Sequence, residues 1–343
     1  MNLIAAFLFV ALALMPVIDA ASMGGLTKRT VIVTGANRGV GLAAIKQLAA
    51  TDEWNIVLAC RSEAKARAAM KTVTKGAENL EFCALDLSDL RSVKNFAKDW
   101  GKRPIDCLAL NAGIQTGSGT IPQRTVQGFE STIGTNHIGH FLLMNLLLKN
   151  VEKSKDGGRI VIVGSGVHNP DEAGGNVGSK ATLGDLRGLK EGFVAPVSMV
   201  DGGAFDPDKA YKDSKLCNVI TSAEMSRRLA AKRSKVTCNC MNPGLIPTTG
   251  LFREFNFLFV SIFTFLTRYV FKVAVSEETG GDRLAFMIAS PVLNGVNGAY
   301  YSSTYFPDPP GYVPTKISTE ASDIKKAKEL WSLTENLIKN SGV

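Results

Sequence analysis

Short apolar runs alternate with amphipathic stretches along the chain, starting near residue 28. The apolar runs are rich in β-branched residues and predict strands at Thr30–Thr34, Asn55–Cys60, Leu80–Leu85, Ile105–Leu110, Arg159–Gly164, Lys235–Met241 and Gly298–Ser302. The amphipathic stretches predict helices from the turn after Thr34 to about Ala50 and at Glu63–Lys75, Asp89–Trp100, Phe129–Asn150, Tyr211–Lys232, Ser276–Ala289 and Ser318–Lys339. Strands that alternate with helices in this way predict right-handed βαβ units and a parallel sheet covered on both faces. We therefore expect an α/β fold, a Rossmann-type doubly wound parallel sheet, in one domain over residues 27–343.

Two long segments interrupt this rhythm. One is rich in Gly and Pro and covers about residues 167–210, and the other is rich in Phe and covers about residues 245–275. Loops of this length are typical of functional excursions. We expect the Phe-rich segment to form a lid over the functional site.

The first 26 residues have a different character. The chain is almost wholly apolar from Leu3 to Ile18 and carries no charge before Asp19. This is short for a membrane span and suits the core of a cleaved targeting signal, with a retained membrane anchor as the alternative. We exclude residues 1–26 from the fold.

Composition narrows the function further. A net charge of +8 could indicate nucleic acid or an anionic membrane, but Lys and Arg form no basic block. We expect no nucleic-acid partner and a pocket for a polyanionic cofactor instead. The six cysteines and three histidines show no zinc-ligand spacing, which predicts no metal, a reducing compartment, and packed or locally bonded histidines at His137, His140 and His168.

A glycine-rich turn lies between the first strand and the first helix. Its pattern is T-G-x3-G-x-G, and the residues expected to contact a cofactor are Gly35, Asn37, Arg38, Gly39 and Gly41. Glycines there allow a tight turn and close approach of the backbone to a pyrophosphate, and the helix N-terminus favours anions. The turn predicts a dinucleotide site.

The second strand ends at Arg61, where folds that prefer NAD carry an acidic residue. A guanidinium suits the 2′-phosphate of NADP(H), and Arg38 adds a second cation. Asp86 and Leu87 follow the third strand and fit an adenine contact. Asn111, Ala112 and Gly113 follow the fourth strand and fit the wall beside the cofactor.

Tyr211 and Lys215 stand four residues apart at the expected start of a helix, so both lie on one face. An adjacent ammonium should lower the pKa of a tyrosine toward neutrality and make it useful for proton transfer. Ser165 can hydrogen-bond a substrate oxygen, and Asn136 can fix Lys215, which also reaches the nicotinamide ribose. With the glycine turn, this set resembles the short-chain dehydrogenase/reductase superfamily over about residues 28–305.

A narrower resemblance rests on the 46 positions between Ser165 and Tyr211, where the superfamily usually has a short loop. The segments that carry it are Val167–Glu172, Leu183–Leu189, Ala204–Asn218, Thr248–Glu254, Val275–Glu278 and Glu320–Asp323. They are similar to light-dependent protochlorophyllide oxidoreductases. The resemblance implies light-triggered hydride transfer from NADPH to a bound tetrapyrrole, with Tyr211 as the proton donor. It also implies a plastid location near thylakoids, reached through the apolar presequence, with the ER or endomembrane as the alternative.

The same resemblance places Pro243 and Gly244 at the cofactor and Asn242, Leu245 and Phe252 at the substrate. The family usually has Tyr-Pro-Gly-Cys where this chain reads Asn242 to Leu245. The Phe-rich segment would cover a flat apolar macrocycle and could rest on a membrane surface. Ordinary core aromatics are the alternative.

Three functions stay open at this point. The leading one is reduction of protochlorophyllide or a related tetrapyrrole. A light-independent NADP-dependent dehydrogenase for a lipophilic alcohol or carbonyl is the second, favoured by Asn242 and Leu245. A non-catalytic NADPH- or pigment-binding protein is the third. The sequence does not predict an oligomeric state.

Overall fold

The computed structural model describes residues 28–116, 119–248, 257–271, 273–303 and 312–343. Its centre is an 8-stranded sheet in the order β3-β2-β1-β4-β5-β6-β7-β8. The strands are β1 (Arg29–Thr34), β2 (Trp54–Cys60), β3 (Leu80–Ala84), β4 (Cys107–Leu110), β5 (Arg159–Val163), β6 (Thr237–Met241), β7 (Tyr300–Ser303) and β8 (Tyr312–Pro314). Strands β1 to β7 pair in parallel, and the direction of winding reverses between β1 and β4. This confirms the predicted doubly wound arrangement.

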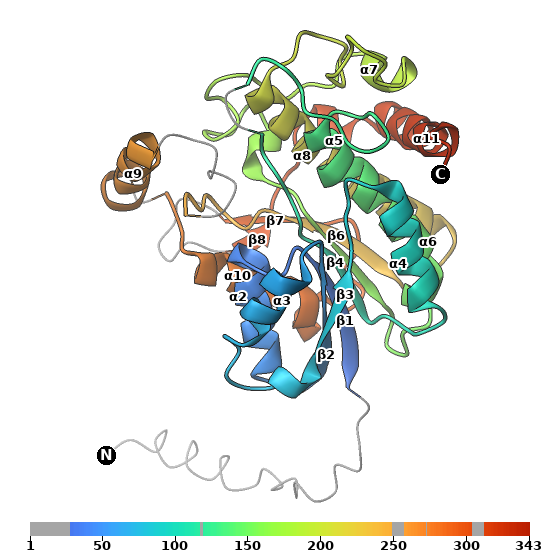
Figure 1. The fold of residues 1–343 in the computed structure, drawn as a ribbon, viewed down its shortest axis with the longest axis vertical. Helices are drawn as coiled ribbons and strands as arrows, with labels where there is room; N and C mark the ends of the chain where they lie inside the picture. Colours follow the sequence, from blue (N-terminus) through green and yellow to red (C-terminus); the bar gives the residue numbers. More distant parts are fainter. Residues whose placement is uncertain (1–27, 117–118, 249–256, 272, 304–311) are drawn as a thin grey trace, which may run out of the picture.

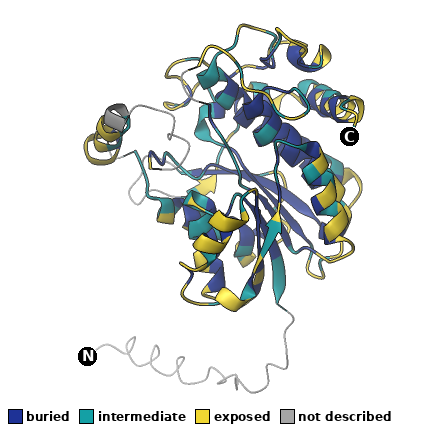
Figure 2. Cartoon of the chain, in the orientation of Figure 1, coloured by how far each residue is buried: buried dark blue, intermediate teal, exposed yellow. Residues whose placement is uncertain are grey.

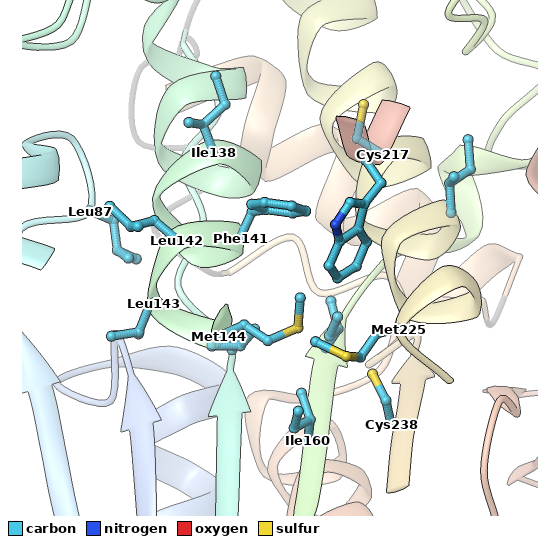
Figure 3. Packing of buried hydrophobic residues seen from close by; sticks show 14 of the residues in the cluster. Leu87, Ile138, Phe141, Leu142, Leu143, Met144, Ile160, Cys217, Met225 and Cys238 are labelled. Carbon is cyan, nitrogen blue, oxygen red and sulfur yellow. The ribbon is translucent and has the colours of Figure 1, made fainter. Parts of the chain in front are cut away.

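Helices cover both faces of the sheet (Figure 1). Successive residues of β1 face the two hydrophobic cores alternately. Val31 and Val33 point to the layer of α2 (Gly39–Ala49), α3 (Glu63–Met70) and α10 (Glu277–Ala289). Ile32 points to the other layer, formed by α4 (Leu90–Trp100), α6 (Gly139–Val151), α8 (Pro207–Ala231) and α11 (Ile324–Asn340). Figure 2 shows the central strands and the inner helix faces as buried. Leu143 and Met144 of α6 pack in this second core (Figure 3).

The helix that carries Tyr211 begins earlier than predicted. Asp206 is the N-cap and accepts from the backbone N–H groups of Asp208 and Lys209, and Pro207 takes the first helical position. Both are strong start signals because they satisfy or remove unpaired backbone donors. Tyr211 therefore lies inside the first turns of α8 rather than at its start.

Other predicted elements differ at their ends. The predicted helix 129–150 is three pieces: α5 (Ser131–Ile133), a π-helix η3 (Gly134–Ile138) and α6. Helix α3 ends at Met70, and α11 begins only at Ile324, after a 3-10 turn at Glu320–Ser322. The antiparallel edge strand β8 was not predicted, so the sheet is not wholly parallel.

The Gly- and Pro-rich excursion contains a short α-helix, α7 (Arg187–Lys190), and is held to α8 by a partly buried cluster of charges. Lys209 Nζ lies 2.5 Å from Asp213 Oδ2 and 3.0 Å from Asp201 Oδ2. Asp213 also accepts from the backbone N–H of Thr182 at 3.0 Å. Burial raises the pKa of Asp213 to about 7. Burial alone would lower the pKa of Lys209, but the negative charges of Asp213 and Asp201 have the larger effect and raise it. The excursion is thus held against α8.

The C-terminal segment holds the same excursion from the other side. Glu320 Oε1 accepts from the backbone N–H of Leu183 at 3.0 Å and from Lys326 Nζ at 2.6 Å. Lys326 also donates to the carbonyl of Gly184 at 2.8 Å. Residues at the far end of the chain therefore help to shape this loop.

Helix α9 (Phe257–Phe265) and the π-helix η6 (Leu266–Val270) stand apart from both helical layers (Figure 1). This segment and the residue after it expose large apolar side chains at Ile262, Phe265, Leu266, Tyr269, Val270 and Phe271. None of the helices in the described ranges has the length and apolar character needed to span a bilayer. Residues 1–26 and the domain boundary after them lie outside the described residues.

Candidate active site

The predicted site residues follow the carboxyl ends of adjacent strands. Because these ends are in register (Val33 opposite Ala109, Leu110 opposite Ile162, Val163 opposite Met241), the loops after them meet at one edge. In doubly wound sheets this edge, near the reversal of strand order, is where ligands bind.

The glycine turn has the backbone that its sequence predicts. Gly35 and Gly39 have φ of +67° and +56°, a region that glycine tolerates without strain. A Cβ atom on Gly41 would lie 2.9 Å from Ala36 Cα and 2.6 Å from Asn111 Nδ2, so only glycine fits against the backbone of this turn. Helix α2 has no acidic residue in its first turn and no side-chain cap, which leaves its N-terminus suited to a phosphate. Asn37 lies half-buried in the same turn.

Cationic side chains flank this turn. Arg61 directly follows β2, its side chain is 73% exposed, and Nη1 lies 3.9 Å from Asp86 Oδ2. Arg38 is exposed at the N-cap of α2. Asp86 also accepts from Ser88, whereas the side chain of Leu87 is buried in the core beside α6 (Figure 3). Leu87 can therefore offer a cofactor only its backbone.

Thr34 joins the turn to the fourth strand end. Its hydroxyl accepts from the backbone N–H groups of Asn111 at 2.9 Å and Ala112 at 3.0 Å. Asn111 returns a bond from Nδ2 to the carbonyl of Thr34 at 2.8 Å. A Cβ atom on Gly35 would lie 2.9 Å from Ala112 Cα. The predicted wall thus lies directly against the glycine turn, and Thr34, to which the sequence analysis gave no role, holds it there.

The four predicted catalytic side chains come together beside this wall. Lys215 Nζ donates to the carbonyl of Val163 at 3.0 Å and lies 5.6 Å from the centroid of the Tyr211 ring. The side chains of Ser165 and Tyr211 are hydrogen-bonded. A Cβ atom on Gly113 would lie 3.6 Å from Lys215 Nζ and 3.7 Å from Asn136 Oδ1.

Asn136 lies within the π-helix and is fixed by its side chain. It accepts from the N–H of Ile114 and donates to the carbonyl of the same residue, both at 2.8 Å. It also donates to Ser214 Oγ at 3.0 Å, and Ser214 donates to the carbonyl of Tyr211 at 2.6 Å. Local π-helical turns often mark functional sites. Asn136 therefore links the cofactor wall to the helix of Tyr211 and Lys215.

The pKa of Tyr211 differs from the prediction. Burial raises the pKa of the Tyr211 phenol well above its usual range, and the hydrogen bond with Ser165 only partly opposes this. The predicted lowering of the Tyr211 pKa is wrong for the protein without a bound cofactor, because the loss of solvation on burial dominates. Burial lowers the pKa of Lys215 to about 8, so at neutral pH most molecules carry a protonated Tyr211 and a charged Lys215.

All three histidines are buried and hydrogen-bonded within the protein, as predicted. His137 Nε2 lies 3.3 Å from Thr334 Oγ1, and His140 Nε2 lies 2.9 Å from Thr34 Oγ1. His168 Nδ1 lies 2.7 Å from the carbonyl of Ser165, and its Nε2 accepts from the N–H of Ser318 at 3.3 Å. The i, i+4 spacing of Asn136 and His140 could have drawn attention to His140. The bond between His168 and Ser318 spans 150 positions, and no local signal predicts it.

The residues after β6 form hydrogen bonds within the protein. Asn242 is buried and bonds Ser302 Oγ at 3.1 Å and the N–H of Gly244 at 3.0 Å. Pro243 accepts from Arg283 at 2.8 Å, and Leu245 is half-buried in a bridge to Ala274. Phe252 lies outside the described residues. Asn242 thus ties this turn to β7.

Comparison with known proteins places this arrangement in a family. A model of the short chain dehydrogenase family matches residues 29–183. The protochlorophyllide reductase of Daucus carota is 42% identical over 318 residues, which are 91% of this chain and 79% of that protein. This chain belongs to the protochlorophyllide reductase family.

Further matches agree with that membership. The protochlorophyllide reductase of Pisum sativum is 41% identical over 94% of this chain and 82% of its own length. A solved structure of a protein from Mycobacterium Paratuberculosis is 29% identical, covers 94% of this chain and 97% of its own, and has a TM-score of 0.66. Protochlorophyllide reductases are short-chain dehydrogenases, so this chain is an oxidoreductase with a nicotinamide cofactor. The two plant relatives are chloroplastic.

Proposed function

We propose that this chain reduces protochlorophyllide to chlorophyllide with NADPH in a light-driven reaction of chlorophyll biosynthesis. The observation that carries the proposal is the gathering of Ser165, Tyr211, Lys215 and Asn136 at one sheet edge, in a chain 42% identical to a protochlorophyllide reductase. The glycine turn, the uncapped α2 and the nearby Arg61 fit a dinucleotide with a 2′-phosphate.

In this proposal the chain's own residues manage protons and geometry. The glycine turn and Arg61 would hold NADPH, which would supply the hydride for one carbon of the ring D double bond. Tyr211 is protonated at neutral pH and donates its proton to the neighbouring carbon, directly or through a relay. Lys215 is charged and stabilises the phenolate that Tyr211 leaves behind. Ser165 shares a hydrogen bond with the phenol and orients it, and Asn136 holds the wall beside Lys215.

Arg61 should decide the choice between the two nicotinamide cofactors. We expect Arg61→Ala to weaken NADPH binding relative to NADH by on the order of tenfold, because hydrogen bonds to charged groups contribute about 1.5–3 kcal/mol and Arg61 is partly screened by solvent. Titration of each cofactor by fluorescence measures the ratio of the two dissociation constants.

Arg67→Ala is the matched control for this prediction. It removes the same charge from α3, where Arg67 Nη2 lies 2.6 Å from Glu63 Oε1. Arg67 belongs to the helix and does not directly follow a strand. The ratio of dissociation constants should stay at the wild-type value in this variant. If Arg61→Ala and Arg67→Ala give the same ratio, Arg61 has no part in cofactor choice.

The exposed apolar surface of α9 and η6 supports two further parts of the proposal. We infer that this Phe-rich segment covers the macrocycle as a lid and that its outer side chains rest on a membrane surface. Phe265→Ser should reduce cosedimentation with vesicles of thylakoid-like galactolipids, since Phe265 is 58% exposed. Unchanged cosedimentation would argue against the membrane contact. The chloroplastic relatives favour a plastid location, with the ER as the alternative.

One assay separates the proposed function from its alternatives. Purified protein is mixed with NADPH and protochlorophyllide and followed by absorbance in darkness and under illumination. Formation of chlorophyllide only in the light supports the proposal. Binding with a shifted pigment spectrum and no turnover would mean a non-catalytic pigment-binding protein, and NADPH oxidation with a lipophilic carbonyl in darkness would mean a light-independent dehydrogenase. The change from the family's Tyr and Cys to Asn242 and Leu245 is the feature that favours this last alternative.

A further inference from the structure

His140 lies enclosed between the cofactor turn and the segment that carries Asn136. Its side chain is buried in α6, two residues after the π-helix ends. One ring nitrogen, Nε2, lies 2.9 Å from the hydroxyl of Thr34, and the other, Nδ1, lies 3.0 Å from the backbone carbonyl of Asn136. The ring therefore bridges the end of β1 and the predicted catalytic asparagine.

The hydrogen-bond partners of Thr34 determine which ring nitrogen of His140 carries the proton. The Thr34 hydroxyl oxygen already accepts hydrogen bonds from the N–H groups of Asn111 and Ala112. The hydroxyl can donate its single proton either to His140 Nε2 at 2.9 Å or to the carbonyl of Ala109 at 3.5 Å, and His140 is the nearer acceptor. A ring that accepts at Nε2 and donates from Nδ1 is the neutral tautomer. Burial lowers the pKa of His140 to about 4, in agreement with a neutral ring.

The bridge continues to the catalytic helix. The side chain of Asn136 bonds Ile114 and Ser214, and Asn136 Oδ1 and Lys215 Nζ both lie next to Gly113. Any shift of His140 would change the distance between the glycine turn and Asn136. We propose that His140 is a positioning residue that sets this distance, and with it the places of the cofactor turn and of Lys215. Its effect on turnover rests on the proposed function, whereas its effect on cofactor binding does not.

Three variants test the proposal. His140→Leu removes both bonds. His140→Asn keeps a side-chain N–H that can donate to the carbonyl of Asn136, four residues earlier. Asn145 makes such a bond to the carbonyl of Phe141 at 2.8 Å in the same helix. The asparagine side chain is too short to reach Thr34 as well. His137→Leu is the control, because His137 is equally buried in the same segment yet contacts Thr334 of α11. For each variant we would measure Tm, the Kd of NADPH, and kcat and KM for light-driven reduction of protochlorophyllide.

We expect His140→Leu to weaken NADPH binding and to lower kcat by about tenfold each, the effect of losing roughly one hydrogen bond in each place. His140→Asn should bind NADPH as weakly as His140→Leu but recover most of kcat. His137→Leu should lower Tm while Kd and kcat stay at wild-type values.

The proposal is overturned if His140→Leu, measured below its Tm, has the NADPH affinity and kcat of His137→Leu. Should His140→Leu fail to fold, wild-type NADPH affinity in His140→Asn would overturn it equally. A wild-type protein that binds NADPH but never reduces the pigment would contradict the proposed function, and the NADPH affinities would still decide the role of His140.

Discussion

Replacement of Tyr211 by phenylalanine is expected to lower the light-driven rate by roughly 10²- to 10⁴-fold, the range for loss of a positioned general acid. The ring remains, so its contact with Lys215 and the packing of α8 should persist. The Kd of NADPH should therefore stay close to the wild-type value. Product formation after a saturating flash and fluorescence titration of NADPH measure the two quantities separately.

Tyr301→Phe is the control for this variant. Tyr301 lies on β7, is buried between Phe286 and Tyr312, and loses the same hydroxyl group. Its rate should match that of the wild type. A normal rate in Tyr211→Phe would refute the role proposed for this phenol.

Replacement of Lys209 by methionine is expected to destabilise the protein at pH 8 by about 3 kcal/mol, because at that pH the buried Asp213 must either stay ionised without its counter-charge or take up a proton. For a chain of this size that corresponds to a fall in Tm of roughly 6 °C. Lys190→Met is the matched control, since Lys190 pairs with Glu329 at 3.1 Å with both side chains 42% exposed. Exposed pairs contribute about 1 kcal/mol at most.

The same variant should show a characteristic dependence on pH. Burial already raises the folded-state pKa of Asp213 to about 7, above its ordinary value of 3.8, and loss of Lys209 can only raise it further. In the variant the folded state therefore keeps the Asp213 proton to a higher pH than the wild type does, so above about pH 7 the free energy of unfolding of the variant continues to fall relative to that of the wild type. Lys209→Met should accordingly be closer to wild-type stability at pH 5.5 than at pH 8. Equal loss at both pH values would mean that Asp213 is not the group left uncompensated.

Much of the fold follows from local patterns in the sequence. The apolar runs place all seven parallel strands, because strands buried on both faces need continuous apolar residues. The edge strand β8 (Tyr312–Pro314) has only three residues and pairs on one side, so it leaves no such run. The π-helix at Gly134–Ile138 was missed for a related reason, since one extra residue in a turn hardly changes an apolar pattern.

Some contacts of the candidate site could likewise be predicted from local sequence patterns, whereas others could not. Spacing alone brings Tyr211 and Lys215 to one helix face, and the strand ends bring Ser165 and Gly113 near them. Bonds between distant segments could not be predicted this way. The contacts of Thr34 with His140 and of Asn136 with Ser214 depend on how whole layers dock, and the direction of the Tyr211 pKa depends on burial.

The bonds of the C-terminal segment bear on how this protein is made. Ser318 and Glu320 contact His168 and Leu183, which lie in the excursion after β5. During synthesis the first six strands leave the ribosome well before these partners do, and proteins fold progressively as they emerge. A nascent chain can therefore assemble its central sheet early. The excursion after β5 can make its final contacts only after Ser318 and Glu320 have emerged.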